Sequence, residues 1–425
     1  MISLTLFGLL LSLMALGVPV AIALGASTAF TLVFLTDFDP VAISALMFES
    51  LDKYALMAIP MFILAGNLLS KGSAAQRIVN LASSLVGHLP GGLPLSAIMA
   101  SVIFAAVSGS SPATVVAVGS IMYGAISDAG YPKSYAIGTI ATSGTLGILI
   151  PPSIVMIIYG VTADVSIGKL FMAGIIPGLM IASMLLLVTY VGAKRLGFKR
   201  AQAQTFKQRL IALKEASWAL LTIVFIIGGI YAGIFTPTEA ASVAVVWALF
   251  IAIYIYKDIG WSEVEEVLFS SAKTSAMILF IIANAMIFSF LLTIENIPQD
   301  LTSYLLESGV TPIIFLLMVN VILFFAGDFM EPSSVIMVLV PLLLPVALTL
   351  GINPIHFGVV VVVNMELGMI TPPIGLNLFV ASSISGLSLK DVMIASLPWS
   401  LTILVGLILV TYIPQISLFL PEFLY

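Results

Sequence analysis

Five consecutive small, polar or helix-breaking residues interrupt a long apolar run. They are Ser108 to Pro112 in "AAVSGSSPATVVAVG", which covers 105–119. A helix that ends here exposes carbonyl oxygens, which attract a hard cation, and the next helix begins with amide protons, which attract a carboxylate. Pro112 suits the first turn of that next helix. The stretch therefore predicts an ion or carboxylate site, while close packing of small residues between helices is the alternative.

A second polar stretch, "ATSGTLGILIPP" at 141–152, offers the same chemistry. Because proline lacks an N–H and disfavours helix at the residue before it, the double proline predicts a break in the helix. Irregular backbone at bilayer depth is tolerated only where protein or a watery cavity covers it. The stretch offers these hydroxyls and free carbonyls: Thr142, Ser143 and Thr145, and the backbone around Gly144, Gly147 and Ile150.

Three acidic residues of the second half, Asp328, Glu331 and Glu366, have no basic partner nearby in sequence. No lysine or arginine occurs between Lys273 and Lys390. Acidic side chains within a membrane are costly and are usually functional. They predict bound sodium, a carried proton, or exposure in an aqueous vestibule, and the residues alone leave these three open.

The composition is that of a polytopic integral membrane protein. Hydrophobic residues make up 61% and charged residues 8% of 425 positions, and the mean hydropathy is +1.22. A bilayer admits only helices or a closed barrel, and long apolar runs without alternation favour helices. There is no cysteine, which excludes disulfides and thiolate metal sites. The first 35 residues lack a basic n-region and an A-x-A site, so we expect a retained helix.

Basic residues concentrate in one short link. Seven of the fifteen lysines and arginines fall between 194 and 214, namely Lys194, Arg195, Lys199, Arg200, Lys207, Arg209 and Lys214. By the positive-inside rule this link lies on the cytoplasmic side.

The sequence on the two sides of the basic link is similar, which predicts an internal duplication. "LGILIPPSIVMIIYG" at 146–160 matches "LGMITPPIGLNLFVA" at 367–381, and Pro112 matches Pro332. Each half thus contains a polar break followed by a double proline. We expect re-entrant hairpins at 92–108 with 112–129 and at 311–327 with 333–350, a continuous kinked helix pair being the alternative.

Further apolar runs predict the remaining membrane helices. They cover 2–36, 54–70, 171–191, 217–234, 238–256, 274–293 and 393–413. Segments 41–52 and 260–272 have charged and apolar faces, so we expect separate helices that lie at the interface.

The sequence contains few residues in patterns typical of an enzyme. There is no H-E-x-x-H motif, and the two histidines, His88 and His356, are far apart. A serine intramembrane protease with Ser143 and His356 lacks the G-x-S-G context, and Asp328 in "FAGDF" lacks the first glycine of G-x-G-D. We therefore expect a protein that is not an enzyme.

Long strings distributed over nearly the whole chain resemble one family. They include "FAAVSGSSPATVVAVGS" at 104–120, "TSGTLGILIPPSIVM" at 142–156, "GGIYAGIFTPTEAA" at 228–241 and "HFGVVVVVNMELGMITPPIGLNLFVAS" at 356–382. The chain resembles the DctM-type large membrane subunit of tripartite ATP-independent periplasmic (TRAP) transporters. This resemblance implies a sodium-coupled secondary importer in the bacterial inner membrane. A small four-helix membrane subunit and a periplasmic solute-binding protein would be its partners.

The resemblance also implies an all-α fold of two inverted repeats that move as an elevator. The first repeat would cover 1–191, with scaffold at about 1–90 and a transport part at about 91–165. After the basic link at 192–215, the second repeat would cover 216–425, with scaffold at about 216–308, a transport part at about 309–388 and a last scaffold helix at about 389–413. Because the chain starts with this portion, we expect the small subunit to be a separate chain.

The family's sodium sites, transferred to this sequence, fall on the two breaks in each half. The first site would use Ser108, Gly109 and Ser110 with Gly144, Gly147 and Pro152. The second would use Gly327 and Glu331 with Asn364, Gly368 and Thr371.

"FMEPSSV" at 329–335 resembles the C4-dicarboxylate branch of the family. The substrate would be a small carboxylate such as succinate, malate or fumarate. It would bind without lysine or arginine, since none occurs at 78–132, 134–168 or 274–389. The residues expected to bind it are Ser110, Ser111, Ser143, Thr145, Ser333, Ser334, Asn364 and Asn377. A stand-alone sodium- or proton-coupled carrier, a channel, and a TRAP subunit for another organic acid such as sialic acid are the alternatives.

Overall fold

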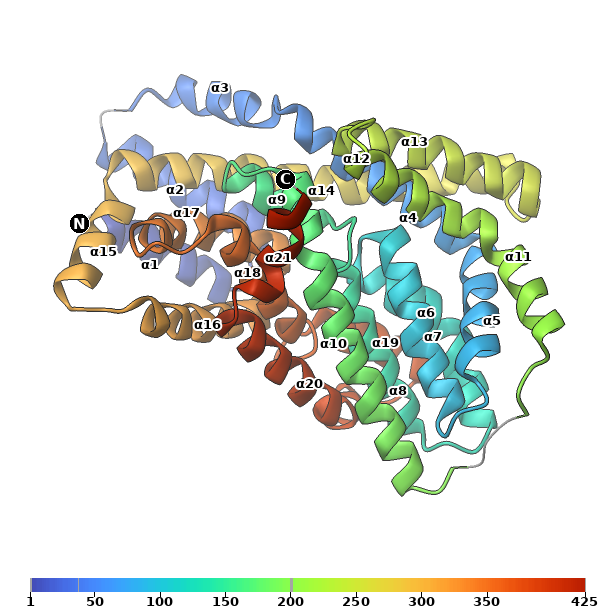
Figure 1. Ribbon diagram of the computed structural model, residues 1–425. Coiled ribbons are helices and arrows are strands. Elements are labelled where there is room, and N and C mark those ends of the chain that lie inside the picture. The colour runs from blue at the N-terminus through green and yellow to red at the C-terminus, as the bar shows by residue number, and fades with distance from the viewer. Residues whose placement is uncertain (1, 37, 199–201, 425) are drawn as a thin grey trace.

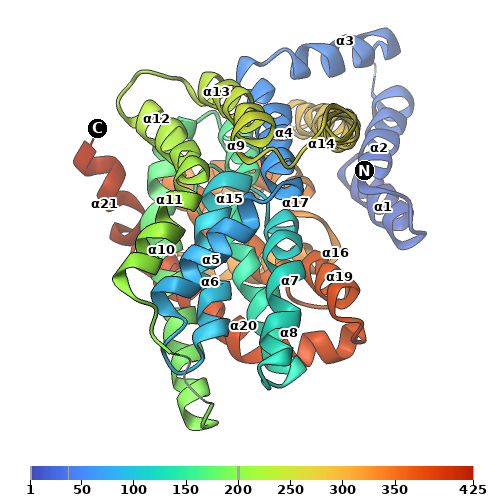
Figure 2. The same ribbon diagram turned by 90° about the vertical axis from the view of Figure 1, so that its right-hand side faces the viewer.

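The computed structural model describes residues 2–36, 38–198 and 202–424, and within these ranges every regular element is a helix. Figures 1 and 2 show the helices in two perpendicular views. Eight helices of this described part are long and apolar enough to span a membrane. The predicted all-helical, multi-span class is therefore confirmed. Lys199 and Arg200 of the basic link lie outside the described residues.

The described residues of the first half form ten α-helices and two 3₁₀ segments. In order they are α1 Ile2–Ala15, α2 Val20–Leu35, α3 Pro40–Leu51, η1 Tyr54–Met57, α4 Ala58–Lys71, α5 Ala74–Val86, α6 Gly92–Ser108, α7 Ser111–Asp128, α8 Lys133–Ser143, η2 Gly144–Ile148, α9 Ile154–Thr162 and α10 Ile167–Arg195.

The part of the second half that the structure describes forms eleven α-helices and two π-helical turns, which continue α11 and α13. In order they are α11 Phe206–Ile223, η3 Val224–Gly228, α12 Gly229–Tyr231, α13 Pro237–Phe250, η4 Ile251–Tyr256, α14 Trp261–Ile294, α15 Ile297–Glu307, α16 Pro312–Phe329, α17 Pro332–Thr349, α18 Pro354–Gly368, α19 Leu376–Ser385, α20 Leu389–Tyr412 and α21 Gln415–Leu424.

Both predicted hairpins form as two helices with a true break between them. Gly109 and Ser110 separate α6 from α7, and Met330 and Glu331 separate α16 from α17. Gly109 adopts a left-handed conformation with φ 61°, while Met330 and Glu331 are extended. The two helices of each hairpin pack against each other. A continuous kinked helix pair, the alternative reading, is therefore wrong.

The expected interfacial helix at 260–272 does not exist as a separate element. It is the first part of α14, a single helix of 34 residues that runs across Figure 1 and is seen end-on in Figure 2. No glycine or proline occurs from Trp261 to Ile297, so nothing in the backbone ends the helix. The ion pair between Lys71 Nζ and Glu266 Oε2, at 2.8 Å, holds its first turns against α4.

Segment 41–52, in contrast, forms its own helix. This helix, α3, lies along the outside of the molecule above α14 in Figure 1, and Ser50 is its single buried residue. Asp39 accepts a hydrogen bond from the Val41 N–H at 2.9 Å and caps the helix start. The helix ends at Leu51, and the 3₁₀ turn η1 separates it from α4. The prediction of a separate helix is thus confirmed, and its position at the membrane interface stays a prediction.

The two halves interlock around one contiguous core. Helix α7 packs on α19, α8 on α20, and α9 on α17. A hydrogen bond joins α9 to the start of α18, because the Tyr159 hydroxyl donates to the Pro354 carbonyl at 2.6 Å. Tyr159 is fully buried, with 0% of its surface exposed. These contacts bring the breaks of both halves to the middle of the molecule.

We predict that Tyr159→Phe lowers the stability of the protein by about 1 kcal/mol, because it removes a buried hydrogen bond. The thermal unfolding midpoint of the purified protein in detergent measures this change. Tyr304→Phe is the matched control, since Tyr304 is 68% exposed. Equal midpoints for the two variants would contradict the prediction.

Candidate ion and substrate site at the hairpin tips

The tip of the first hairpin is held against the broken segment that follows α8. The Ile154 N–H donates to the Gly109 carbonyl at 3.3 Å. A Cβ at Gly109 would lie 2.8 Å from the carbonyl oxygen of Pro152, a separation too small for a side chain. Glycine is required here by both the positive φ and this close approach.

Carbonyl and hydroxyl oxygens crowd the same tip. The hydroxyls of Ser108 and Thr114 lie 3.0 Å apart, and the Thr114 hydroxyl donates to the Ser110 carbonyl at 2.8 Å. A Cβ at Gly147 would lie 2.6 Å from the Ser110 carbonyl, and one at Gly66 would lie 3.0 Å from the Ser108 carbonyl. The structure thus brings Ser108, Gly109 and Ser110 of the first predicted sodium site close to Gly147 and Pro152, whereas Gly144 faces Val115. That these residues bind sodium stays a prediction.

The tip of the second hairpin is anchored in a corresponding way. The Ile374 N–H donates to the Asp328 carbonyl at 3.1 Å. Gly327 and Gly368 are in close contact, since a Cβ at Gly368 would lie 2.8 Å from the Gly327 backbone. The Thr371 hydroxyl donates to the Leu367 carbonyl at 2.6 Å. Gly327, Gly368 and Thr371 of the second predicted sodium site therefore lie around one break.

A cavity of about 260 Å³ lies between the two tips. Ser110 and Ser111 of the first hairpin and Glu331 and Ser333 of the second line it. None of the described residues that line it is a lysine or arginine.

Four helices begin at this cavity. Their first residues all line it: Ser111 of α7, Ile154 of α9, Pro332 of α17 and Leu376 of α19. The first amide groups of a helix lack partners within the helix, and they carry partial positive charge. Four such ends around one space create a positive potential that favours an anion without any cationic side chain.

Asn377 links the two halves beside this cavity. Its amide Nδ2 donates to the Ser111 hydroxyl at 2.7 Å and to the Ala141 carbonyl at 3.3 Å. Asn377 is fully buried, and its Oδ1 has no partner. This side chain therefore orients Ser111 and keeps a free acceptor at the site.

Five of the eight residues predicted to bind substrate do not line the cavity: Asn377 beside it, Asn364, and the three hydroxyl residues Ser143, Thr145 and Ser334. The Ser143 hydroxyl lies 3.0 Å from that of Ser101, and the Thr145 hydroxyl donates to the Thr142 carbonyl at 2.8 Å. Ser334 is also buried, directly after Ser333. In the conformation described, these hydroxyls lie behind the lining of the cavity.

Asn364 lies one turn before Gly368 on α18 and does not line the cavity between the tips. Its Nδ2 donates to Asn320 Oδ1 at 2.6 Å, and Asn320 in turn donates to the Thr411 hydroxyl at 3.0 Å. Asn364 and Asn320 line a separate, mainly apolar cavity of about 320 Å³ between α16, α18 and α20. Its predicted roles in sodium and substrate binding stay predictions.

The acidic residues lack cationic partners. The ion pair between Lys71 and Glu266 is the single one among the described residues. Glu366 is fully buried, and neither of its carboxylate oxygens has a hydrogen-bond partner. Asp328 and Glu331 each have one buried carboxylate oxygen that also lacks a hydrogen-bond partner. No group of three histidines or acidic residues that would suit a multivalent metal occurs in the described part of the chain.

The sequence analysis missed Gly66, Asn67 and Thr274. They line a smaller cavity of about 110 Å³ beside Ser108 and Ser110, and Thr274 also lines the larger one. Asn67 donates to the Ser271 hydroxyl at 2.9 Å. The available signal was a glycine–asparagine pair within an apolar run, in the string "FILAGNLL".

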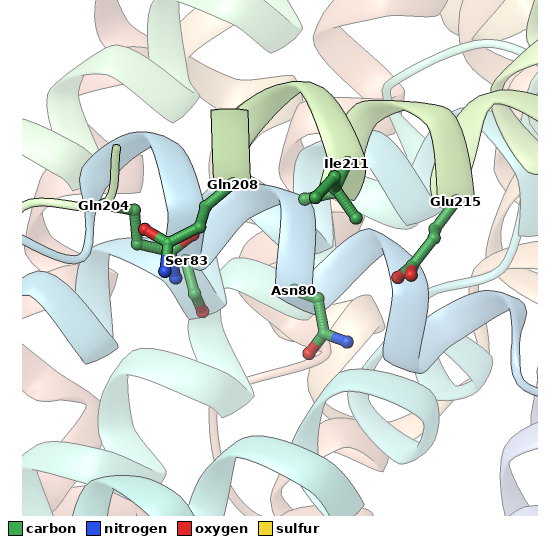
Figure 3. A pocket seen from close by; sticks show the side chains of 7 residues that line it. Asn80, Ser83, Gln204, Gln208, Ile211 and Glu215 are labelled. Atoms are coloured by element: carbon green, nitrogen blue, oxygen red, sulfur yellow. The ribbon is translucent and has the colours of Figure 1, made fainter. Parts of the chain in front are cut away.

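A polar groove elsewhere on the molecule is shown in Figure 3. Asn80 and Ser83 of α5 face Gln208, Ile211 and Glu215 of α11 across it. None of the described residues that line this groove is the first residue of a helix, so the groove lacks the positive helix ends that would attract a carboxylate. The space between the hairpin tips remains the candidate site for an anion.

Comparison with known proteins identifies the family. Residues 7–416 match the family described as "Tripartite ATP-independent periplasmic transporter, DctM component". The chain belongs to this DctM family of TRAP transporters. One relative, the C4-dicarboxylate TRAP transporter large permease protein DctM of Rhodobacter capsulatus, is 49% identical over 100% of both chains. The sialic acid TRAP transporter large permease protein SiaM of Vibrio cholerae is 37% identical, over 97% of this chain and 96% of its own.

The fold of this DctM-family chain is also similar to a solved structure. The YdaH transporter of Alcanivorax borkumensis, described as having an unusual topology, superposes with a TM-score of 0.61 at 17% identity. The match covers 91% of each chain. Both named relatives are permeases, which agrees with the expectation that the chain is not an enzyme.

We predict that Gly109→Ala destabilises this DctM-family chain more than Gly130→Ala does. Both glycines have a positive φ, but a Cβ at Gly130 would meet nothing within 4 Å, whereas one at Gly109 would meet the Pro152 carbonyl. The difference should be about 1–3 kcal/mol, the usual effect of overpacking. Thermal midpoints and the folded fraction on size-exclusion chromatography measure it. Equal losses would show that the tip does not depend on this close contact.

Proposed function

We propose that this chain is the sodium-coupled permease subunit of an importer of C4-dicarboxylates such as succinate, malate or fumarate. The identity of 49% to a C4-dicarboxylate permease, against 37% to a sialic acid permease, supports this substrate class. The string "FMEPSSV" at the second tip supports it as well. A periplasmic solute-binding protein delivers the substrate, and a small four-helix membrane subunit completes the transporter in the bacterial inner membrane.

The observation that carries this proposal is the convergence of four helix starts on a cavity lined by serines and free of lysine and arginine. Each helix end contributes about 0.3–2 kcal/mol of attraction for a negative charge. This is enough to orient two carboxylates but too little to hold a dianion tightly. Ser110, Ser111 and Ser333 donate hydrogen bonds to the carboxylates, and bound sodium supplies the remaining positive charge.

Sodium binds where helices end, on the opposite side of each tip from the substrate carboxylates. The end of α6 offers carbonyl oxygens at Ser108, Gly109 and Ser110, beside the Pro152 carbonyl. At the end of α16, sodium binds near Gly327 and Glu331, beside Gly368 and Thr371. Carbonyl, hydroxyl and carboxylate oxygens are ligands that suit a hard cation. A buried carboxylate without a partner is stabilised most by such a cation, because its charge is otherwise unbalanced.

The two hairpins with the broken helices beside them form the moving part of an elevator made of two inverted repeats. The same order of hairpin, broken helix and long helix in both halves supports this proposal, as do the corresponding anchoring bonds from Ile154 and Ile374. The parts at about 91–165 and 309–388 carry the substrate, and the remaining helices form the scaffold.

We predict that succinate uptake into liposomes needs all three components and a sodium gradient. Sodium coupling follows because the site has no side-chain cation of its own to balance a dianion. The measurement is accumulation of labelled succinate with sodium, or with potassium at the same ionic strength and pH. Uptake that survives the replacement of sodium would contradict the coupling. Robust uptake by this chain alone would favour a stand-alone carrier.

Proton coupling is the second candidate, and the complete burial of the unpartnered Glu366 favours it. We predict that Glu366→Gln keeps sodium-driven uptake, whereas Glu331→Gln raises the sodium concentration for half-maximal uptake by roughly tenfold, since about 1.4 kcal/mol of sodium binding is lost. Glu307→Gln, on the exposed end of α15, is the control. Loss of uptake in Glu366→Gln, with uptake driven by a pH gradient in the unmodified protein, would establish the second candidate instead.

A further inference from the structure

The smaller cavity of about 110 Å³ lies directly beside the cavity between the hairpin tips. It has room for one small ion and a few waters. Its walls are the first hairpin, α9 and two helices of the proposed scaffold, α4 and α14. These two scaffold helices pack on each other, and Figure 2 shows α14 end-on beside α4. The two cavities share four lining residues, which are Ser110, Ile154, Thr274 and Ile278.

The first hairpin presents an unpaired carbonyl oxygen to this cavity. Ser108 ends α6, and its carbonyl would accept a helical hydrogen bond from residue 112, which is a proline without an N–H. No other backbone N–H of the described residues donates to it. A Cβ at Gly66 would lie 3.0 Å from this oxygen, so the carbonyl points toward α4. Ser110, which carries a hydroxyl, lines the cavity as well.

The scaffold side of the cavity contributes two more acceptor oxygens. Asn67 of α4 donates through Nδ2 to the Ser271 hydroxyl at 2.9 Å, and no described residue donates to its Oδ1. Thr274 of α14 donates its hydroxyl hydrogen to the Ser270 carbonyl at 3.1 Å, which leaves the lone pairs of that hydroxyl oxygen free. Both side chains are half-buried. Their hydrogen-bond donors are thus engaged within the protein, whereas their oxygens are available.

These lining groups suit a monovalent cation. None of the described residues that line the cavity is acidic or basic. An anion would need donors, and those of Asn67 and Thr274 are already used. Divalent cations in proteins are usually bound with carboxylates, which are absent from the described lining. Neutral carbonyl, amide and hydroxyl oxygens remain, and they are ligands for a hard ion with a single charge.

Polar side chains continue from this cavity along the contact between α4 and α14. Lys71 follows Asn67 by one helical turn, and its Nζ pairs with Glu266 Oε2 at 2.8 Å. The charge of the nearest lysine on α4 is therefore balanced. Ser271 lies between Glu266 and the cavity, and its hydroxyl accepts the hydrogen bond from Asn67. The contact between the two helices thus offers polar groups from the cavity to the end of α4.

The end of α4 lies on the side of the basic link. Just after this helix, the Ser73 N–H donates to the carboxylate of Asp258. Two residues before Asp258, the Tyr256 hydroxyl donates to the Glu215 carbonyl of α11 at 3.1 Å. Helix α11 follows the basic link, which the positive-inside rule places on the cytoplasmic side. The polar contact between α4 and α14 therefore leads from the first tip toward the cytoplasm.

We propose that this smaller cavity binds one sodium ion that has left the first tip on its way to the cytoplasm. Its ligands are the Ser108 carbonyl and the Ser110 hydroxyl on the hairpin, and Asn67 Oδ1 and the Thr274 hydroxyl on the scaffold. Neither scaffold residue belongs to the first predicted sodium site. Because each part supplies half of the ligands, the ion is bound here only while the hairpin lies against α4 and α14. This inference rests on the proposed function, in which sodium enters the cell with the substrate.

Two substitutions at Asn67 test the proposal, because a cation ligand and a purely structural residue respond differently. Asn67→Ala removes Oδ1 and should abolish this ion position. Asn67→Asp keeps an oxygen there and adds a negative charge, so it should tighten binding. If Asn67 served only to hold Ser271, both variants would lose its donor and behave alike. Asn80→Asp, which adds the same charge at an exposed position of α5, is the matched control.

The measurement is the thermal unfolding midpoint of the purified full chain while sodium chloride replaces choline chloride at constant ionic strength. A pH of 8 keeps the introduced carboxyl group ionised. The slope of the midpoint against the logarithm of the sodium concentration grows with the number of ions bound. We expect the rise in Asn67→Asp to begin at a roughly tenfold lower sodium concentration than in the unmodified chain. Asn67→Ala should show a shallower slope at high sodium, and Asn80→Asp should follow the unmodified chain.

A curve for Asn67→Asp that coincides with that of Asn67→Ala or of Asn80→Asp would overturn the proposal, as would a midpoint of the unmodified chain that is independent of sodium. Should the Asn67 variants fold poorly, Thr274→Val and Thr274→Asp replace them with the same expectations. Succinate uptake by the unmodified three-component transporter tests the proposed function separately. Uptake that requires sodium, together with coinciding curves for the variants, would contradict this inference alone.

Discussion

The structure depends on one constraint, which is that backbone polar groups within a bilayer must find partners. A continuous helix satisfies them internally, whereas each break exposes carbonyl oxygens on one side and amide protons on the other. At the first tip the Ile154 N–H and the Thr114 hydroxyl donate to the carbonyls of Gly109 and Ser110. Each of these carbonyl oxygens keeps a second lone pair, which can bind a cation. The breaks are therefore the source of the binding chemistry.

The electrostatic potential at the site also follows from these breaks in the helices. Four helix starts give the cavity a positive potential, while Asp328, Glu331 and Glu366 lack cationic side chains nearby. An anionic substrate alone would be held weakly, and unpaired acids alone would be unfavourable. Under the proposed function, a bound sodium ion would relieve both problems at once. Substrate and sodium would then each improve the site for the other, and their binding would be reciprocally linked.

Much of the site could be predicted from the sequence because its key residues break helices. Ser108 to Pro112 and the two double prolines stand out in an apolar chain, and the breaks at Gly109 and Met330 occur there. Other contributions depend on packing between distant segments. Thr274 and Asn67 reach the first tip only because α14 and α4 pass beside it, and Asn364 turns away toward Asn320 on a neighbouring helix. The continuity of α14 was missed because its amphipathic start resembled a separate surface helix.

The linkage between substrate and sodium is tested most directly by calorimetry on the purified complex. Succinate is titrated at several sodium concentrations, with potassium keeping the ionic strength constant, and sodium is titrated with and without succinate. The account predicts that sodium tightens succinate binding and that succinate tightens sodium binding by the same factor. Succinate affinity that is independent of sodium would contradict it.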